Sequence, residues 1–325
     1  MLNFEYMKLA TQVAMQNLGR TGTNPSVGAV IVEGNLISTG FTGLNGTPHA
    51  EINAIENAKK IGINLKKSTL YVTLEPCCHY GKTPPCAKSI VEEGICKVFF
   101  GFHDPDPRVN GGGVKFLQEN GIYTEFLPIN ETNQLHKSYS IFKTKNRPFV
   151  SLKIASSLDS KIALSNGKSK WITNQNARNY TNFLRSRFNG ILVGANTIRT
   201  DSPKLDCRIE GLQHFSPKKF VASKTNFSNY TNVFGTIEEI LLQIHQNNIQ
   251  RLLVEGGGNL ITQFLQSNLF DELTLIQSPI FLGSDSKNAI ENLNLKEIPE
   301  QNLEITSQKT FNHNTIITYN NLNAK

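Results

Sequence analysis

Residues 48–51 read Pro-His-Ala-Glu and residues 75–86 read Glu-Pro-Cys-Cys-His-Tyr-Gly-Lys-Thr-Pro-Pro-Cys, and both stretches lie where predicted elements of the first half of the chain begin or end. Helical periodicity predicts a helix over residues 50–60, so the first stretch opens that helix. The apolar residues 69–74 predict a strand that runs directly into the second stretch. A helix amino terminus therefore faces the loop that follows a strand, as in a layered α/β sheet.

Strands and helices alternate in the rest of the first half as well. The expected elements are helices over residues 3–18, 86–93 and 114–120, a hairpin of strands 27–32 and 36–41, and strands 97–101 and 122–127. A polar segment, residues 128–148, follows, and its charged end over residues 143–148 is the best candidate for a linker. We therefore place a domain boundary after residue 145.

The second half repeats the α/β pattern without repeating the sequence of the first. The expected strands cover residues 149–155, 190–194, 251–255 and 273–277, and the expected helices cover residues 175–187, 237–246 and 259–266. A chain of 325 residues is about twice the usual length of one domain. The predicted fold class is therefore α/β with two domains, residues 1–145 and 146–325.

The composition excludes several classes of protein. Hydrophobic residues make up 38% and charged residues 18% of the chain, which favours packed cores over disorder. No apolar stretch approaches the roughly 20 residues of a membrane-spanning helix, and residues 1–10 lack the features of a secretory signal. We expect a cytoplasmic protein without a membrane partner.

The net charge of +7 and the pI near 9.1 suit an anionic ligand. Nucleic acid, anionic lipid and a phosphorylated small molecule all fit this charge. The basic residues are scattered in ones and twos, however, and no run of five appears. This distribution disfavours nucleic acid as the partner.

Three of the five cysteines lie within ten residues of each other, at positions 77, 78 and 86. In a cytosolic chain such clustering favours a metal site over disulfide bonds. His49, Cys77 and Cys86 can bind Zn²⁺ and leave its fourth position open, as in a catalytic site. Cys78 is the weaker candidate, because adjacent residues point apart. The alternative is that His49 is an ordinary surface residue and that the cysteines have a purely structural role. A structural zinc site, however, normally has a fourth protein ligand.

Glu51 completes the pattern His-x-Glu, Pro-Cys and Cys that is typical of zinc deaminases. Its carboxylate is expected to move a proton from a zinc-activated water to a departing amine. The gap between Cys77 and Cys86 is much longer than the two residues found in common nucleobase deaminases. This difference speaks against a nucleic-acid deaminase, which stays open as an alternative.

Four stretches, residues 24–30, 48–51, 75–86 and 103–107, give the chain a specific resemblance. It resembles the bifunctional riboflavin-biosynthesis deaminase/reductase family, called RibD or RibG. The resemblance implies a cytidine-deaminase-like three-layer domain with zinc, followed by a dihydrofolate-reductase-like domain that uses NADPH. The implied reactions are deamination of 2,5-diamino-6-(5-phosphoribosylamino)pyrimidin-4-one and reduction of the ribosyl group of 5-amino-6-(5-phosphoribosylamino)uracil to ribityl. A homo-oligomer is also implied.

The same resemblance implies which residues line the deaminase pocket. These residues are Asn24, His79, Lys82, Asp104 and Asp106. Two positions depart from the pattern, because the family usually has Asn at position 106 and His at position 42, where this chain has Thr42. Both departures concern contacts with the substrate and leave the metal ligands unchanged.

The reductase half carries a second set of implied residues. Contacts with NADPH are implied for Ala155, Trp171, Thr197, Asp201, Ser223, Gly256, Gly257 and Gly258. Contacts with the substrate are implied for Lys153, Ser169, Arg185, Leu205, Arg208 and Glu255, and the candidate catalytic groups are Asp201 and Glu255. The glycine turn before the helix at residue 259 offers free backbone N–H groups to a phosphate. Lys153, Arg185 and Arg208 suit a ribose phosphate, because cations form charge-assisted hydrogen bonds to its oxygens.

Three departures weaken the resemblance in the reductase half. Ser160 replaces a usual Gly, Ala222 replaces a usual Asp, and the segment between Arg208 and Arg251 is shorter than usual. A deaminase whose carboxy-terminal half is a non-catalytic module therefore stays open as a second alternative.

Overall fold

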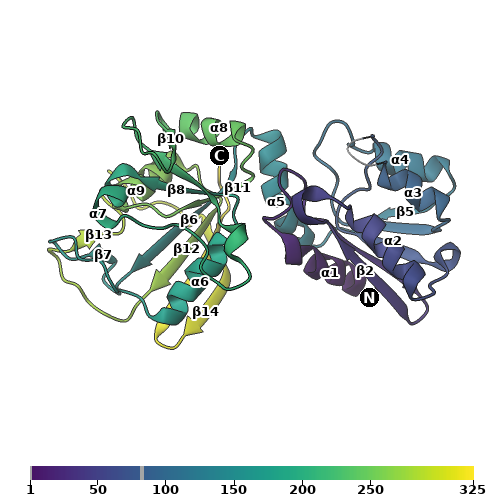
Figure 1. Cartoon of the computed structure of the whole chain (residues 1–325), viewed down its shortest axis with the longest axis horizontal. Coiled ribbons are helices and arrows are strands. Elements are labelled where there is room, and N and C mark those ends of the chain that lie inside the picture. The colour runs from purple at the N-terminus through teal and green to yellow at the C-terminus, as the bar shows by residue number, and fades with distance from the viewer. Residues whose placement is uncertain (1, 81–83) are drawn as a thin grey trace. The chain divides into compact units, whose positions relative to one another are not determined.

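The computed structural model describes residues 2–80 and 84–325 and divides the chain into two compact units, Met1–Asn146 and Arg147–Lys325 (Figure 1). Each unit contains its own sheet with helices packed on it, so both are α/β as expected. No helix in the described part of the chain combines the length and the apolar character that a membrane span needs.

The first unit is a five-stranded sheet in the order β2-β1-β3-β4-β5. Its strands are β1 (Gly28–Glu33), β2 (Leu36–Phe41), β3 (Thr69–Val72), β4 (Lys97–Phe100) and β5 (Tyr123–Phe126). Its helices are α1 (Leu2–Ala14), α2 (Ala50–Lys60), α3 (Cys86–Glu92), α4 (Gly112–Glu119) and α5 (Asn130–Thr144). Strand β1 pairs antiparallel with β2 and β3, whereas β3, β4 and β5 are parallel.

Alternate residues of the central strands bury their side chains on opposite faces of this sheet. Ile31 of β1 belongs to the core with α2, α3 and α4, whereas Val30 packs with Met7 of α1 on the other face. Two glycines allow the helices to lie close to the strands. A Cβ atom on Gly28 would lie 1.9 Å from the Ala10 carbonyl oxygen, and one on Gly40 would lie 2.3 Å from the Ala50 carbonyl oxygen.

The parallel pair β3 and β4 determines where the first candidate site lies. Both strands end at the same edge of the sheet, so the loops that follow them are neighbours. The Glu75 N–H donates to the Phe102 carbonyl at 2.9 Å and joins the two loops. Cys77 and Asp104 therefore come from separate loops at one edge.

Helix α5 was not predicted, because residues 128–148 were interpreted as a polar segment ending in a linker. Leu135, Tyr139 and Phe142 lie at the spacing of one helix face and are buried, whereas most of the other positions are polar. A narrow apolar stripe on a helix that is otherwise polar gives a weak signal in the sequence. Only residues 145–148 connect α5 to the next strand.

The second unit is an eight-stranded sheet in the order β10-β9-β8-β11-β6-β12-β15-β14, with a small sheet of β13 and β7. The strands are β6 (Phe149–Ser156), β7 (Lys161–Ala163), β8 (Gly190–Gly194), β9 (Lys218–Ala222), β10 (Thr231–Val233), β11 (Arg251–Val254), β12 (Glu272–Gln277), β13 (Lys287–Asn288), β14 (Leu303–Phe311) and β15 (Asn314–Asn321). The helices are α6 (Gln175–Arg185), α7 (Ala195–Asp201), α8 (Ile237–Gln246) and α9 (Gly258–Ser267).

The strands from β10 to β12 are parallel, and β15 and β14 extend the sheet antiparallel at one edge. Helices α8 and α9 pack on one face through buried residues such as Leu241 and Phe264. Ala177 of α6 packs against Ile276 and Ile316 in a separate cluster. The strands β8, β11 and β6 end beside α7, α9 and Trp171, which places the second candidate site at their carboxyl edge.

Candidate functional site

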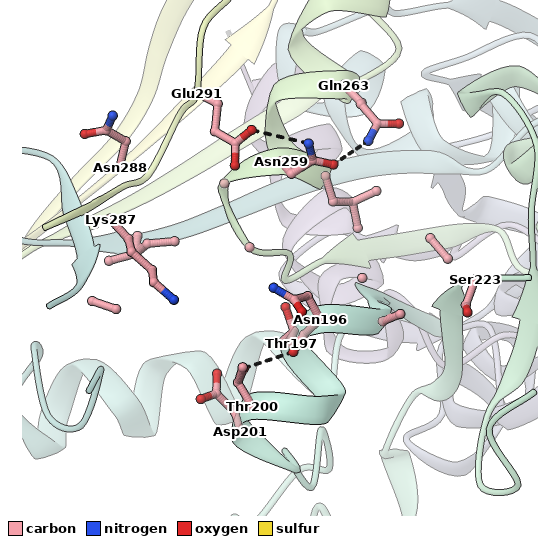
Figure 2. Close-up of a pocket in the computed structure, with 18 of the residues that line it drawn as sticks. Asn196, Thr197, Thr200, Asp201, Ser223, Asn259, Gln263, Lys287, Asn288 and Glu291 are labelled. Atoms are coloured by element: carbon pink, nitrogen blue, oxygen red, sulfur yellow. Dashed lines mark hydrogen bonds between the residues drawn. The ribbon is translucent and has the colours of Figure 1, made fainter. Parts of the chain in front are cut away.

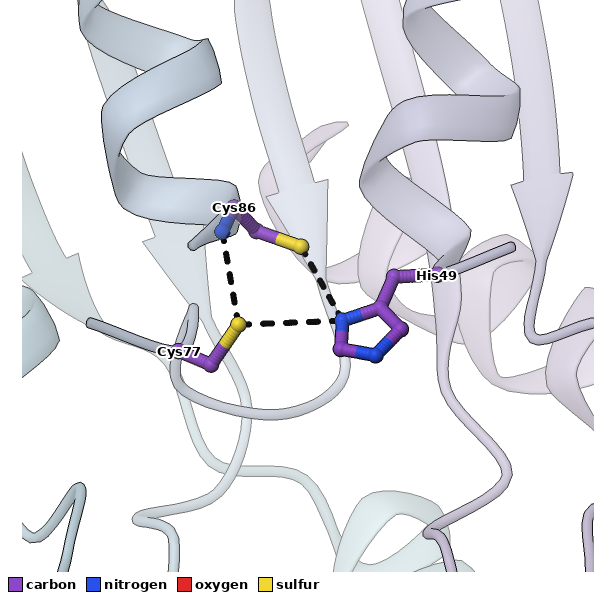
Figure 3. A group of neighbouring side chains, drawn as sticks. All are labelled: His49, Cys77 and Cys86. Carbon is purple, nitrogen blue, oxygen red and sulfur yellow. Dashed lines mark hydrogen bonds between the residues drawn. The ribbon is translucent and has the colours of Figure 1, made fainter. Parts of the chain in front are cut away.

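The first candidate site is a group of three metal-binding side chains from three different elements (Figure 3). His49 is the N-cap of α2, Cys77 lies in the loop after β3, and Cys86 is the first residue of α3. The Nδ1 atom of His49 lies 3.2 Å from the Cys86 Sγ and 3.6 Å from the Cys77 Sγ. All three ligand atoms lie within 4.8 Å of one another, which suits a single tetrahedral zinc ion.

The electrostatics of the two cysteines also suits a metal. The Cys86 side chain donates to Cys77 and lowers the pKa of the Cys77 thiol to about 4, although burial opposes this change. The pKa of Cys86 is raised in return by that hydrogen bond and by burial. One thiolate is therefore ready to bind a cation, and the charge of the cation favours the second thiolate as well.

Glu51 lies on the first turn of α2 and is buried beside the group. Burial, with a smaller contribution from the Cys77 thiolate, raises the pKa of Glu51 to about 7. A carboxyl group with a pKa near neutrality both accepts and releases a proton readily. Cys78 lies apart, with its Sγ 3.9 Å from the Arg108 carbonyl oxygen, and it does not belong to the group.

A cavity of about 320 Å³ opens onto these side chains. Its lining includes four of the predicted pocket residues, Asn24, His79, Asp104 and Asp106, together with His49, Glu51 and Cys77. Lys82 lies outside the described residues. Sequence reasoning missed Arg108, Tyr139 and Lys143, which also line the cavity, and two of these come from the unpredicted helix α5.

The two departures from the family pattern have structural partners. Thr42 is buried, and its hydroxyl oxygen accepts a hydrogen bond of 2.9 Å from the Val27 N–H. Asp106 accepts hydrogen bonds from both Arg108 and Lys143. Next to it, burial raises the pKa of Asp104 to about 6, although the Asp106 N–H and the Tyr139 hydroxyl donate to its carboxylate.

Glu75 holds this edge of the sheet together. Its buried carboxylate accepts hydrogen bonds of 3.1 Å from the N–H groups of Gly111 and Gly113 and one of 3.3 Å from that of Val114. It therefore ties the start of α4 to the loop that carries Cys77. A negative charge at a helix amino terminus is also favourable to the helix dipole.

The second candidate site consists of two adjoining cavities at the carboxyl edge of the larger sheet. The larger cavity, of about 700 Å³, is lined by five of the residues predicted to contact the cofactor: Thr197, Asp201, Ser223, Gly257 and Gly258. Figure 2 shows Asn196, Thr197, Thr200 and Asp201 on α7, opposite Asn259 and Gln263 on α9. A cavity of this volume, with hydroxyl, amide and carboxylate side chains in its lining, offers room and hydrogen-bond partners for a nucleotide cofactor.

The smaller cavity, of about 300 Å³, shares Thr197, Asp201 and Gly257 with the larger one. It contains the predicted substrate residues Lys153, Ser169, Arg185, Leu205, Arg208 and Glu255, and the predicted cofactor residues Ala155, Trp171 and Gly256. Trp171 is 67% exposed, and the Arg178 guanidinium lies 4.3 Å from the centre of its ring. The ring therefore stands at the cavity rim and not in the core.

A buried charge cluster lies in the smaller cavity. The Arg185 guanidinium donates to both oxygens of Glu255, at 2.7 and 2.9 Å, and the Lys153 Nζ lies 3.0 Å from the same carboxylate. Burial alone would raise the pKa of Glu255, but the two cations together lower it to about 2. Arg208 differs, because it is exposed and lies 3.5 Å from Asp206. Arg185 is thus held by a buried carboxylate, whereas Arg208 is exposed and pairs with the more accessible Asp206.

Comparison with known proteins covers both units. Residues 3–102 match the cytidine and deoxycytidylate deaminase zinc-binding region, and residues 148–317 match the RibD C-terminal domain. The riboflavin biosynthesis protein RibD of Aquifex aeolicus is 32% identical, with 94% of each chain covered. That of Bacillus amyloliquefaciens is 34% identical, with 86% of this chain and 85% of the relative covered. The chain belongs to the RibD family.

A solved structure agrees with this assignment over both units. The diaminohydroxyphosphoribosylaminopyrimidine deaminase/5-amino-6-(5-phosphoribosylamino)uracil reductase of Thermotoga maritima is 31% identical, covers 98% of both chains and has a TM-score of 0.87. As a RibD-family protein, the chain is a bifunctional enzyme of riboflavin biosynthesis with a zinc-binding deaminase domain and an NADPH-dependent reductase domain. The predicted family, fold class, bifunctional activity and cofactors are confirmed.

Proposed function

We propose that this RibD-family enzyme acts first on 2,5-diamino-6-(5-phosphoribosylamino)pyrimidin-4-one and then on 5-amino-6-(5-phosphoribosylamino)uracil. Residues 1–145 carry out the deamination, and residues 146–325 carry out the reduction. The observation that carries the proposal is the group of His49, Cys77 and Cys86 with the buried Glu51 beside it. The activities named for the Thermotoga maritima relative support this choice of substrates.

In the deamination, a ring amine is replaced by oxygen and leaves as ammonia. The chemistry that zinc supplies when held by the three ligands is the acidification of a water molecule. With zinc held there, Glu51 would accept a proton from the attacking water and deliver it to the departing amine, because its buried carboxylate lies beside the three ligands. Asn24, His79, Lys82, Asp104 and Asp106 hold the substrate.

In the reduction, a hydride and a proton open the ribosyl ring to a ribityl chain. The larger cavity would hold most of the nicotinamide cofactor, and the smaller one would hold the substrate together with the part of the cofactor that contacts Ala155, Trp171 and Gly256. The proposed cofactor contacts are Ala155, Trp171, Thr197, Asp201, Ser223, Gly256, Gly257 and Gly258. The proposed substrate contacts are Lys153, Ser169, Arg185, Leu205, Arg208 and Glu255.

Asp201 and Glu255 are the proposed catalytic groups of the reductase. Asp201 lines both cavities, so it lies where cofactor and substrate meet. Glu255 holds Lys153 and Arg185 in the substrate cavity through its two ion pairs. A cytoplasmic location, a homo-oligomeric state and the absence of a nucleic-acid partner stay predictions.

The test measures each half separately. Purified protein is given the diaminopyrimidinone without NADPH, and ammonia release and product mass are followed. The deaminated product is then given with NADPH, and oxidation of the cofactor is followed by absorbance. Release of ammonia in the first assay and oxidation of NADPH in the second support the proposal, whereas failure of either assay refutes the corresponding half.

A further inference from the structure

Two cations lie side by side at the wall of the deaminase cavity. Arg108 follows β4, and Lys143 lies in the last turn of α5, so they come from separate elements. The Arg108 Nη2 lies 2.6 Å and the Lys143 Nζ 3.0 Å from the same oxygen, Oδ2 of Asp106. The Arg108 Nε donates to the other oxygen at 2.9 Å. One carboxylate therefore brings the two cations together.

The two cations are more accessible than the carboxylate that holds them, and both line the cavity. The Asp106 side chain is 6% exposed, whereas those of Arg108 and Lys143 are 64% and 26% exposed. Two cations against one carboxylate leave the cluster with a positive charge. Asp104 is nearby, and its carboxylate accepts hydrogen bonds from the Asp106 N–H and the Tyr139 hydroxyl. Among the described residues it forms no hydrogen bond or ion pair with either cation, although its charge interacts with that of Arg108.

Both cations keep hydrogen-bond donors that Asp106 does not use. A guanidinium has five N–H donors and an ammonium has three. Asp106 occupies two of the five on Arg108 and one of the three on Lys143. Among the described residues that line the cavity, Arg108 is the only arginine and Lys143 is the only lysine. They are therefore the strongest candidates for binding an anionic group.

We infer that Arg108 and Lys143, held by Asp106, bind the phosphate of the deaminase substrate and select the phosphorylated form over the free riboside. This inference rests on the proposed function, which gives the substrate a phosphoribosylamino group. A phosphate monoester offers several oxygens to the donors of both side chains. In addition to its proposed contact with the substrate, Asp106 positions both cations, because its carboxylate pairs with each of them.

The test compares two substrates in three variants of the full chain. The substrates are the phosphorylated diaminopyrimidinone and the same compound with its phosphate removed. The variants are Arg108→Met, Lys143→Met and, as a control, Lys115→Met, which removes an exposed lysine on α4. Steady-state KM and kcat of deamination are measured, and zinc content is measured for each variant.

We expect the KM for the phosphorylated substrate to rise about tenfold to a hundredfold in Arg108→Met and in Lys143→Met. The KM for the riboside, kcat and zinc content should stay unchanged, and Lys115→Met should behave like the wild type. In the wild type, the riboside should already have the higher KM.

Two results overturn the inference. An equal rise of KM for both substrates would mean that the cluster only ties α5 to the loop after β4, and an unchanged KM would mean that the cations do not touch the phosphate. Failure of the proposed function would look different, because the wild type itself would then release no ammonia from either substrate.

Discussion

The ion pairs of Glu255 predict how much stability the second unit loses when this carboxylate is neutralised. Its carboxylate makes contacts of 2.7, 2.9 and 3.0 Å with Arg185 and Lys153, and its side chain is 8% exposed. Glu255→Gln keeps the shape of the side chain but leaves two cations without their counter-ion. Because removing one partner of a buried ion pair costs about 3–5 kcal/mol, we expect the free energy of unfolding of this unit to fall by that amount.

Hydrogen exchange of the amides in β6 and β11 measures this loss within the second unit alone. Glu304→Gln, which neutralises an exposed carboxylate on β14, is the matched control and should change the free energy by less than about 0.5 kcal/mol. The double variant Glu255→Gln, Arg185→Met should lose less than the sum of the single variants, because the side chains interact directly. A loss below about 1 kcal/mol in Glu255→Gln would refute the reasoning.

The other predictions concern the deaminase unit. Glu51→Gln should keep zinc but lower the rate of deamination by at least roughly 10², because it removes the proton acceptor. Cys86→Ala should lose zinc and Cys78→Ala should keep it, as measured by metal analysis of the purified variants. Burial lowers the pKa of His136 to about 3, below its usual 6.5, so the unit should lose stability as the pH falls below about 6.5. At pH 5 this loss is about 2 kcal/mol and should be absent in His136→Gln.

Each of these predictions has a result that would contradict it. Near-normal deamination by Glu51→Gln would exclude the proton-transfer role, and loss of zinc from Cys78→Ala would overturn the ligand set. For His136, the unfolding free energies of wild type and variant are compared between pH 5 and 7, so that contributions of other groups cancel. If the unfolding free energies of wild type and His136→Gln change with pH in parallel, His136 does not cause the pH dependence.

The sequence indicated the three side chains of the metal group for a physical reason, and the structure brings them together. A catalytic zinc site needs specific ligand types at restricted positions, so His49, Cys77 and Cys86 leave a clear pattern even though they come from separate elements. The apolar strands β1, β3 and β11 were equally clear, because buried strands are continuous hydrophobic runs.

The remaining features depend on tertiary contacts that local patterns do not record. Strand β14 was missed because it is an exposed edge strand with mostly polar residues, and β15 was missed because Asn and Thr make up most of its sequence although it is largely buried. Arg185 pairs with Glu255, which lies far from it in the chain. The sequence does not reveal this pairing, so the positive charge of Arg185 suggested only that it binds the phosphate of the substrate. Lys143 was assigned to a linker, although α5 carries it to the wall of the deaminase cavity.

The most direct test of the bifunctional assignment is one incubation of the pure protein with 2,5-diamino-6-(5-phosphoribosylamino)pyrimidin-4-one, with and without NADPH, followed by mass spectrometry. Without NADPH, the reaction should stop at 5-amino-6-(5-phosphoribosylamino)uracil. With NADPH, that compound should gain two hydrogens and become the ribityl product. Accumulation of the deaminated compound in both samples would contradict an active reductase, and unchanged starting material in both would contradict the deaminase.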